Sequence, residues 1–259
     1  EIVEPFILLG TDGACNYSHW LSRNLLKLYL LEQFRVSASI PLLVNRDLSS
    51  YQIEYLEHLG VGRERLLLVS TSELIKCSCI FVPVTLRNHP QMPRAINWLR
   101  DRLSNLMQPQ AQRQPLLYIS RRDSMQRVLL NEAELEESLA ALGFSIVTLS
   151  GLSVREQVGL FANADVIVSP HGAGLSNLMF APRSTAVVEI TNTKIRHMIE
   201  FEWIANAMGQ RYFKIVSDLY PAEQPVEFEL DPHQKHNYFA PTQAVVDCVK
   251  KIVGARRFA

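Results

Sequence analysis

Short apolar runs alternate with amphipathic segments along the whole chain. Phe6–Leu9 and Ile40–Val44 are apolar runs bounded by turn residues, as strands are. Residues 17–34 instead carry apolar side chains at helical spacing, which predicts one continuous helix. The same criteria predict strands at 6–9, 40–44, 65–69, 79–84, 116–120, 145–149, 166–169, 186–190 and 212–216. They predict helices at 17–34, from Ser49 or Ser50 to Gly60, and at 92–107, 131–142, 153–163, 174–180, 196–208 and 242–253.

This alternation predicts an α/β protein built on mostly parallel sheets with right-handed crossovers. Residues 108–115 are polar, bounded by proline and without an apolar face, so they are the best linker in the chain. We therefore expect two doubly wound, Rossmann-like domains, at residues 1–110 and 111–259. The final helix, 242–253, belongs to the second domain in sequence and has the option of packing back on the first.

Composition narrows the class of protein. The 259 residues are 47% hydrophobic and carry no formal net charge, which excludes a disordered chain and disfavours a broad nucleic-acid-binding surface. Four scattered cysteines form no metal or disulfide framework and favour a reducing, cytoplasmic location. No apolar run reaches the roughly 20 residues that span a bilayer. Because the sequence starts at Glu1, an upstream anchor and membrane association stay open.

Polar side chains follow several strands of the predicted second domain. Arg121 and Arg122 follow strand 116–120, the segment from His171 to Gly174 follows strand 166–169, and Glu189 lies near the end of strand 186–190. In open α/β sheets, ligands bind beyond the carboxyl ends of the strands. We expect all of these residues to face one edge of the sheet.

The chemistry of these residues suits an anion. Gly172, Ala173 and Gly174 let backbone amides approach a ligand at the start of a helix, which favours a diphosphate. Arg121, Arg122 and Arg127 supply guanidinium donors for phosphate oxygens. The simpler alternatives are a tight turn without ligand, a structural histidine at 171, and a solvated arginine pair. Asn131 and Glu132 begin the next helix, where Glu132 alternatively compensates the helix dipole, and Asn177 alternatively caps a turn.

Several motifs are absent from the sequence. It has no Asp-x-Asp pair for a metal-bound sugar nucleotide, no phosphate-binding P-loop and no Gly-x-Ser-x-Gly nucleophile elbow. Gly172 and Gly174 begin a dinucleotide fingerprint, but Asn177 stands where its third glycine belongs. That turn also comes late in its domain, which disfavours a nicotinamide cofactor.

Taken together, these residues resemble glycosyltransferase family 61, which includes capsular polysaccharide biosynthesis proteins. The resemblance runs from Tyr118-Ile-Ser-Arg-Arg122 through Arg127 and Asn131-Glu132 to Pro170-His-Gly-Ala-Gly-Leu-Ser-Asn177 and Val187-Val-Glu-Ile190. It implies an inverting enzyme of the GT-B type, with two domains facing a cleft. The enzyme would move a sugar from a nucleotide donor, usually a UDP-sugar, to a glycan acceptor. It also implies that the second domain binds the donor, that the first contacts the acceptor, and that neither a metal ion nor a cofactor is needed.

Inversion requires a base that removes the proton from the acceptor hydroxyl. Candidates in the first domain are Asp12, His19 and Asp47. His19 lies in Asn16-Tyr-Ser-His-Trp-Leu21, which is similar to a His-Trp-Leu segment of the family, and alternatively packs as a helix-start residue on Trp20. The family often continues with an acidic residue and Leu-Pro-Arg-Leu, whereas this sequence has Arg23 and Leu25-Leu-Lys-Leu28.

Two other functions remain as alternatives. The missing acidic residue near Arg23 is compatible with a non-catalytic module that binds sugar nucleotides or glycans. The incomplete dinucleotide fingerprint is compatible with an NAD-dependent oxidoreductase. Binding of UDP, GDP and NAD, followed by a transfer assay, separates all three functions.

Overall fold

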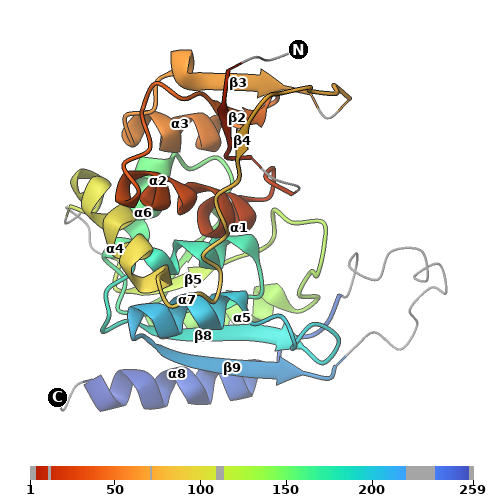
Figure 1. The fold of residues 1–259 in the computed structure, drawn as a ribbon. Coiled ribbons are helices and arrows are strands. Elements are labelled where there is room, and N and C mark those ends of the chain that lie inside the picture. Colours follow the sequence, from red (N-terminus) through yellow and green to blue (C-terminus); the bar gives the residue numbers. More distant parts are fainter. Residues whose placement is uncertain (1–3, 11–12, 71, 109–113, 220–236, 257–259) are drawn as a thin grey trace. The chain divides into compact units, whose positions relative to one another are not determined.

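Figure 1 shows the computed structural model, which describes residues 4–10, 13–70, 72–108, 114–219 and 237–256. The chain divides into two compact units. Unit 1 comprises Glu1–Gln108 and Ser153–Val158, and unit 2 comprises Pro109–Leu152 and Gly159–Ala259. Residues 109–113 of the expected linker lie outside the described residues, as does Asp12. None of the helices in the described ranges is long and apolar enough to span a membrane.

Unit 1 contains a four-stranded parallel sheet in the order β3-β2-β1-β4. Ile7, Leu42 and Val44 point to one face of this sheet, where they are fully buried. The strands are β1 (Phe6–Leu8), β2 (Leu42–Asn45), β3 (Leu66–Val69) and β4 (Ile80–Phe81). The helices are α1 (Tyr17–His19), η1 (Trp20–Leu25), α2 (Lys27–Gln33), α3 (Ser50–His58), η2 (Arg63–Arg65), α4 (Met92–Arg102) and η3 (Ser104–Leu106).

Unit 2 contains a five-stranded parallel sheet in the order β6-β5-β7-β8-β9. The order reverses beside β5, between β6 and β7, and parallel sheets of this kind bind ligands at such a point. The strands are β5 (Leu116–Ile119), β6 (Ser145–Val147), β7 (Val166–Pro170), β8 (Ala186–Asn192) and β9 (Arg211–Ser217). The helices are α5 (Glu132–Ala140), α6 (Val154–Ala162), η4 (Ala173–Met179), α7 (Glu200–Met208) and α8 (Thr242–Arg256).

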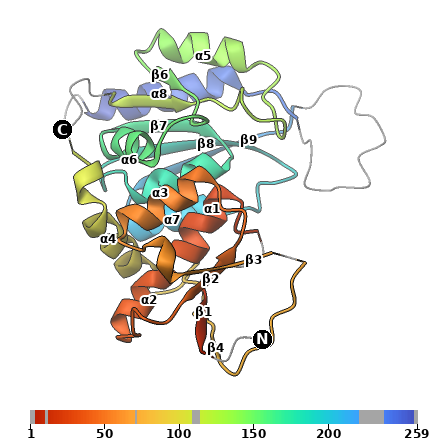
Figure 2. The ribbon, with the colours of Figure 1, turned by 90° about the horizontal axis from the view of Figure 1, so that it is seen from above.

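Helices cover both faces of the sheet in unit 2. Leu139 of α5 and Val249 of α8 pack with Val168 and Val188 in one core cluster, and α5 and α8 lie side by side (Figure 2). Helices α7 and α8 lie on opposite sides of β8 and β9 (Figure 1). The final helix therefore packs on the sheet of unit 2. This two-sided cover explains the consecutive apolar residues of β5 and of the first halves of β7 and β8.

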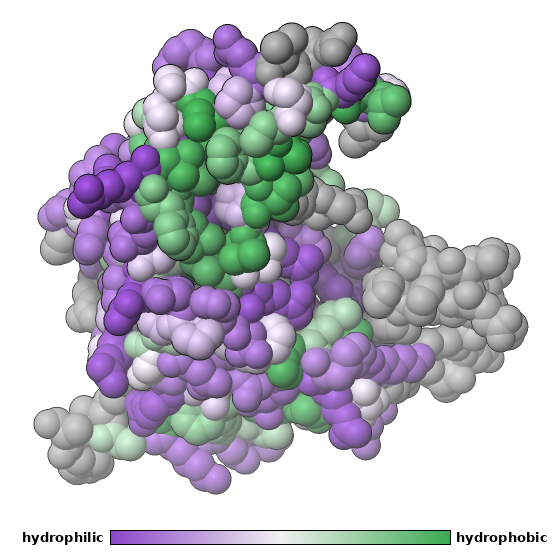
Figure 3. Space-filling model, viewed as in Figure 1, coloured by the Kyte–Doolittle hydropathy of each residue, from purple (hydrophilic) through white to green (hydrophobic). Residues whose placement is uncertain are grey.

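Apolar side chains remain on the surface of unit 1 near β3 and β4 (Figure 3). Ile80 and Phe81 are each 42% exposed, and Val82 and Val84 are 60% and 63% exposed. Among the described residues between β3 and β4 there is no helix to cover them. The edge strand β4 is consequently less shielded than the strands at the centre of the sheet in unit 2.

The predicted helix at 17–34 is interrupted. Its middle, η1, is a π-helix, in which each backbone hydrogen bond spans one residue more than in an α-helix. The Asn24 side chain donates to the backbone carbonyl of His19, five residues earlier, at 3.1 Å. The wider turn rotates the following residues and directs Lys27 into the core, where its Nζ atom donates to the Leu9 carbonyl at 2.8 Å.

Other predicted elements differ mainly at their ends. The strand predicted at 79–84 contains only Ile80–Phe81, the helix predicted at 92–107 ends at Arg102, and the one predicted at 196–208 begins at Glu200. The short helix expected at 174–180 is the 3₁₀ helix η4, whose hydrogen bonds are less well aligned than those of an α-helix. It offers a weaker set of aligned amides to an anion than the sequence suggested.

Candidate functional site

The candidate site of unit 2 lies at the carboxyl end of β5, where Arg121 and Arg127 lie close together. Burial lowers the pKa of both guanidinium groups, and the charge of Arg127 lowers that of Arg121 further. The Nε atoms of both are shielded from solvent and have no hydrogen-bond partner among the described residues. Two adjacent cations with unsatisfied donors are a site at which an anion gains both charge and hydrogen bonds.

Arg121 is held in place by its own loop. Its Nη2 atom donates to Ser124 Oγ at 2.7 Å and to the Gln126 carbonyl at 3.0 Å. Its guanidinium group also occupies the space that a β-carbon on Gly172 would need. Gly172 has an extended backbone with φ of −173°, so this position needs glycine because of the close approach and not because of its conformation.

Arg127 adopts a left-handed backbone conformation, with φ of 55°. Residues other than glycine rarely adopt this conformation, and such positions cluster at functional sites. The loop that carries Arg127 is braced by a distant segment: Tyr238 N donates to the Val128 carbonyl at 3.1 Å, and Val128 N donates to Asn237 Oδ1 at 3.0 Å. Contacts more than 100 residues apart in sequence thus fix the arginine-bearing loop.

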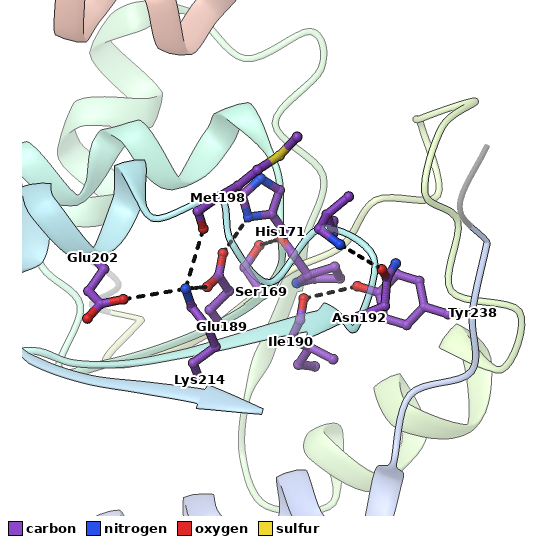
Figure 4. Close-up of polar contacts among 11 residues, drawn as sticks. Ser169, His171, Glu189, Ile190, Asn192, Met198, Glu202, Lys214 and Tyr238 are labelled. Atoms are coloured by element: carbon purple, nitrogen blue, oxygen red, sulfur yellow. Dashed lines mark hydrogen bonds and ion pairs between the residues drawn. The ribbon is translucent and has the colours of Figure 1, made fainter. Parts of the chain in front are cut away.

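His171 and Glu189 form a buried pair directly after β7 (Figure 4). His171 Nδ1 lies 2.5 Å from Glu189 Oε1, and the two side chains are 5% and 1% exposed. The imidazole also packs against the Phe201 ring, with centroids 4.9 Å apart. Nε2 of His171 has no hydrogen-bond partner among the described residues, so the carboxylate fixes the ring and leaves this nitrogen for other contacts.

The position of Glu189 corrects the sequence prediction. Strand β8 continues to Asn192, so Glu189 lies inside the strand and is buried beneath His171. Its second oxygen lies 3.5 Å from Lys214 Nζ, which in turn lies 3.4 Å from Glu202 (Figure 4). The side chain is therefore part of a buried network of charges that supports the turn at 171–174.

Four other predicted donor-site residues make contacts within the protein. Arg122 pairs with Glu136 at 3.1 Å. Glu132 accepts hydrogen bonds from the Tyr118 hydroxyl at 2.8 Å and from the Arg121 amide at 2.9 Å. Asn131 binds the segment that leads into α8, and Asn177 is fully buried within η4. Of these contacts, the one from Glu132 to the Arg121 amide supports the backbone of the arginine loop.

The turn at 172–174 is partly open on its outer side. Ala173 and Gly174 are half-buried, while Leu175 and Asn177 are buried. A β-carbon on Gly174 would lie 2.6 Å from Leu149 Cδ1, so this glycine permits close packing on the loop after β6. The structure thus brings together Arg121, Arg127, Gly172 and the His171–Glu189 pair.

His19 of unit 1 lies at the carboxyl end of the other sheet. It ends α1, and its imidazole packs against the turn after β1: a β-carbon on Gly13 would lie 2.6 Å from Nδ1. The Asn16 side chain caps this helix by accepting from the amides of Ser18 and His19 at 2.9 and 3.3 Å. His19 is half-buried, and Asp47, which follows β2, is exposed.

Sequence reasoning missed Tyr238, Lys214 and Lys27. The Tyr238 hydroxyl donates to the Ile190 carbonyl at 3.0 Å, and burial raises the pKa of this phenol. Each of the three residues owes its role to a contact at least 16 residues away in sequence. No local pattern marks them, and only an unusual polar residue within an apolar stretch could have drawn attention to Lys27.

The described residues hold no group of three or more histidine, cysteine, aspartate or glutamate side chains arranged for a metal ion. Charge at the candidate site comes from arginine side chains. The fold and the site together define an α/β protein of two parallel-sheet units, one of which presents a pair of cations at the carboxyl edge of its sheet.

Sequence comparison places this protein in a family. The model of the family Glycosyltransferase 61 matches residues 17–188, which is more than half of the chain. The chain therefore belongs to glycosyltransferase family 61, as the motifs around Arg121 and His171 predicted.

Individual relatives match over shorter stretches. A beta-1,2-xylosyltransferase of Oryza sativa subsp. japonica is 38% identical over 97 residues, which is 37% of this chain and 17% of the relative. An EGF domain-specific O-linked N-acetylglucosamine transferase of Drosophila melanogaster is 31% identical over 118 residues, which is 44% of this chain and 22% of the relative. A beta-1,2-xylosyltransferase of Arabidopsis thaliana is 31% identical over 101 residues, 34% of this chain and 19% of the relative. The chain thus spans about a fifth of the length of these relatives.

Proposed function

We propose that this protein is an inverting glycosyltransferase of the GT-B type, which transfers a sugar from a UDP-sugar to a hydroxyl group of a glycan. Its membership of family 61 supports glycosyl transfer, and the Arg121–Arg127 pair is the observation that carries the donor assignment. The relatives named above are xylosyl- and N-acetylglucosaminyltransferases. UDP-xylose and UDP-N-acetylglucosamine are therefore the first donors to test. Those relatives are plant and animal proteins, so they add no support for a capsular acceptor.

In the proposed reaction, the acceptor oxygen attacks the anomeric carbon of the donor from the side opposite the diphosphate. A base in unit 1 takes the acceptor proton, and His19, at the carboxyl end of its sheet, is our first candidate, with Asp12 as the second. The bond between the anomeric carbon and the diphosphate oxygen breaks, and its electron pair leaves with UDP. Arg121 and Arg127 neutralise the charge that develops on the diphosphate, so we propose that no metal ion is required.

Calorimetric titration with UDP, GDP and NAD tests the donor site. We expect UDP to bind, and Arg121→Ala to weaken that binding at least tenfold, which corresponds to about 1.4 kcal/mol. Arg122→Ala is the matched control, because that side chain is 62% exposed and pairs with Glu136. Binding of NAD without any nucleoside diphosphate would refute the proposal, and an unchanged affinity in Arg121→Ala would remove Arg121 from the site.

Turnover separates an enzyme from a binding module. We expect release of UDP from UDP-xylose or UDP-N-acetylglucosamine in the presence of EDTA, increased by a suitable glycan acceptor. Tight UDP binding with no turnover across donors and acceptors would instead indicate a non-catalytic module, and loss of turnover in EDTA would show that a metal ion takes part.

A further inference from the structure

An aromatic cluster lies beside the candidate base in unit 1. The rings of Tyr17, on α1, and Tyr51, on α3, meet edge to face with centroids 5.1 Å apart, and Tyr55 lies 6.3 Å from Tyr17. Tyr55 is fully buried, whereas Tyr17 and Tyr51 are half-buried. Tyr55 therefore forms the buried part of the cluster, and the rings of Tyr17 and Tyr51 reach the surface.

Both surface rings are held rigidly. The Tyr51 hydroxyl donates to the Cys15 carbonyl at 2.8 Å, and the hydroxyl groups of Tyr17 and Tyr55 lie 2.9 Å apart. Gln52, beside Tyr51, donates to the Ala14 carbonyl at 3.0 Å. The hydroxyl groups are thus occupied, and the part of each tyrosine left for a ligand is its ring. Rings fixed before binding lose little conformational entropy when a ligand stacks on them.

The loop after β1 contacts both the aromatic cluster and the candidate base. The Tyr51 hydroxyl is bound at Cys15, and the His19 imidazole packs on Gly13, two residues earlier. Two residues of extended chain span at most about 7 Å, which is comparable to one pyranose residue. The loop follows β1 and α3 follows β2, so these groups share the carboxyl edge of the sheet, where α/β proteins bind ligands.

The chemistry of this edge suits a neutral, hydroxylated ligand. Residues 13–19 and helix α3 include no lysine or arginine, and the acidic Glu54 lies on the same helix as Tyr51 and Tyr55, so these two segments favour a neutral ligand over a phosphate group. The exposed Asn16 uses its side-chain oxygen as a helix cap, and its amide nitrogen has no partner among the described residues. Aromatic rings attract the weakly positive C–H groups of a sugar face, and the amide can donate to a sugar hydroxyl.

We propose that Tyr17, Tyr51 and Asn16 form an acceptor subsite, in which a pyranose residue of the glycan acceptor stacks on the tyrosine rings beside His19. This inference rests on the proposed glycosyl transfer and adds to it the place and the chemical class of the acceptor. The rings select a pyranose with an apolar face, and the Asn16 amide orients it through a hydroxyl group.

Saturation-transfer NMR with short manno- and xylo-oligosaccharides tests the subsite in the intact protein. We expect saturation of the tyrosine rings to pass to the ring protons of a bound sugar in the unmodified protein. Tyr51→Leu and Tyr17→Leu should weaken oligosaccharide binding about tenfold, equivalent to about 1.4 kcal/mol, while Tyr51→Phe stays within about twofold. Trp98→Leu is the matched control. Trp98, on α4, is another half-buried aromatic residue of unit 1, and its ring packs on that of Tyr29, on α2.

Titration with UDP keeps this test separate from that of the donor site. Normal UDP binding and cooperative unfolding in the tyrosine variants, together with weakened oligosaccharide binding, support the subsite. Oligosaccharide binding that is absent from the unmodified protein, shows no transfer from the tyrosine rings, or persists unchanged in Tyr51→Leu overturns the subsite and leaves the donor assignment intact. If the unmodified protein does not bind UDP, the proposed function itself is refuted. If the leucine variants do not fold, hydrogen exchange of the unmodified protein decides the result: the oligosaccharide must slow exchange at residues 13–19 and 50–55, and no protection there overturns the subsite.

Discussion

At the scale of single residues, both units contain a buried charged side chain, but the neighbours that stabilise the charge differ between them. In unit 2, Glu189 lies between His171 and Lys214, so the buried carboxylate has two basic neighbours. In unit 1, Lys27 is buried against three neutral acceptors, the carbonyls of Leu8 and Leu9 and the Asn24 side chain, at 3.4, 2.8 and 3.4 Å. A lysine buried without a carboxylate destabilises its charged form, because no opposite charge offsets the loss of hydration.

The pKa of Lys27 leads to a prediction about stability. Burial lowers this pKa from 10.5 to about 8, so the unfolded chain holds the lysine proton over a range of pH in which the folded chain releases it. The cost of the buried charge is fully present below pH 8 and disappears as pH rises from 8 to 10.5. We expect the free energy of unfolding of the unmodified protein to rise across that window relative to that of Lys27→Met.

Urea unfolding at several pH values between 7 and 11 measures this difference, since other titrating groups cancel between the two proteins. Lys214→Met is a useful comparison, because Lys214 lies between Glu189 and Glu202. Parallel stability curves for the unmodified protein and Lys27→Met would show that Lys27 keeps its ordinary pKa in the folded state.

At the scale of elements, the start of α5 is tied to the start of α8. Asn131 accepts from the Ala240 amide at 2.7 Å and donates to the Ala240 carbonyl at 3.0 Å and to Thr242 Oγ1 at 3.2 Å. The side chain thereby satisfies backbone groups of a segment 109 residues away. The arginine loop immediately precedes Asn131, so this tie also supports the candidate donor site from behind.

Asn131 has a structural role in this contact, whereas the sequence suggested that it binds the donor, and a variant can distinguish these two roles. We expect Asn131→Ala to lower the free energy of unfolding by about 1–3 kcal/mol, because it leaves buried backbone groups without partners. UDP affinity measured on the folded variant should change less than in Arg121→Ala. Asn131→Asp, which keeps the oxygen that accepts from Ala240, should lose less stability. A loss of UDP affinity at unchanged stability would show that Asn131 contacts the donor.

Local signals predicted most elements and many of their ends. The helix predicted to run to Gly60 and those predicted at 131–142 and 196–208 each end at or beside a glycine, and Gly60, Gly143 and Gly209 adopt positive φ angles of 72°, 87° and 68°. The helix predicted at 153–163 starts at Ser153, whose amide donates to Glu156 Oε2 at 2.8 Å and whose hydroxyl accepts from the Glu156 amide at 3.2 Å. These features depend on neighbouring residues, so the sequence is sufficient to predict them.

Features that depend on distant contacts were not predictable in the same way. The apolar spacing of residues 17–34 fits an α-helix throughout, and nothing in it indicates the π-helix η1 or the bond from the Asn24 side chain to the carbonyl of His19. Convergence of Arg121 with Gly172 followed from the parallel sheet, because both come directly after neighbouring strands. The contribution of Tyr238 did not, since nothing near it in sequence indicates that it reaches β8.

At the scale of the whole molecule, each unit has its own parallel sheet and its own candidate chemistry. The cationic pair and the His171–Glu189 pair belong to unit 2, and His19 with the tyrosine cluster belongs to unit 1. Helix α6 is shared: residues 153–158 group with unit 1 and the residues from Gly159 on group with unit 2. Within unit 1, Glu54 of α3 accepts from the amides of Val154 and Arg155 at 2.9 and 3.2 Å.

This division predicts where a nucleotide stabilises the chain. A ligand that binds only the folded state adds about 2.7 kcal/mol to stability when its concentration is about 100 times its dissociation constant. Protection from hydrogen exchange then appears in the segments that must open before the ligand is released. Hydrogen exchange followed by mass spectrometry should therefore show slower exchange with UDP at residues 120–131 and 170–176. The tyrosine cluster of unit 1 should show a smaller change.

The two halves of this expectation can be tested apart. Arg121→Ala should abolish the protection of residues 120–131 at the same UDP concentration, while Arg122→Ala, which alters only the contact with Glu136, should preserve it. A short manno- or xylo-oligosaccharide should instead protect residues 13–19 and 50–55, where the tyrosine rings lie. Protection by UDP that is confined to residues 13–19 would reverse the assignment of donor and acceptor to the two units.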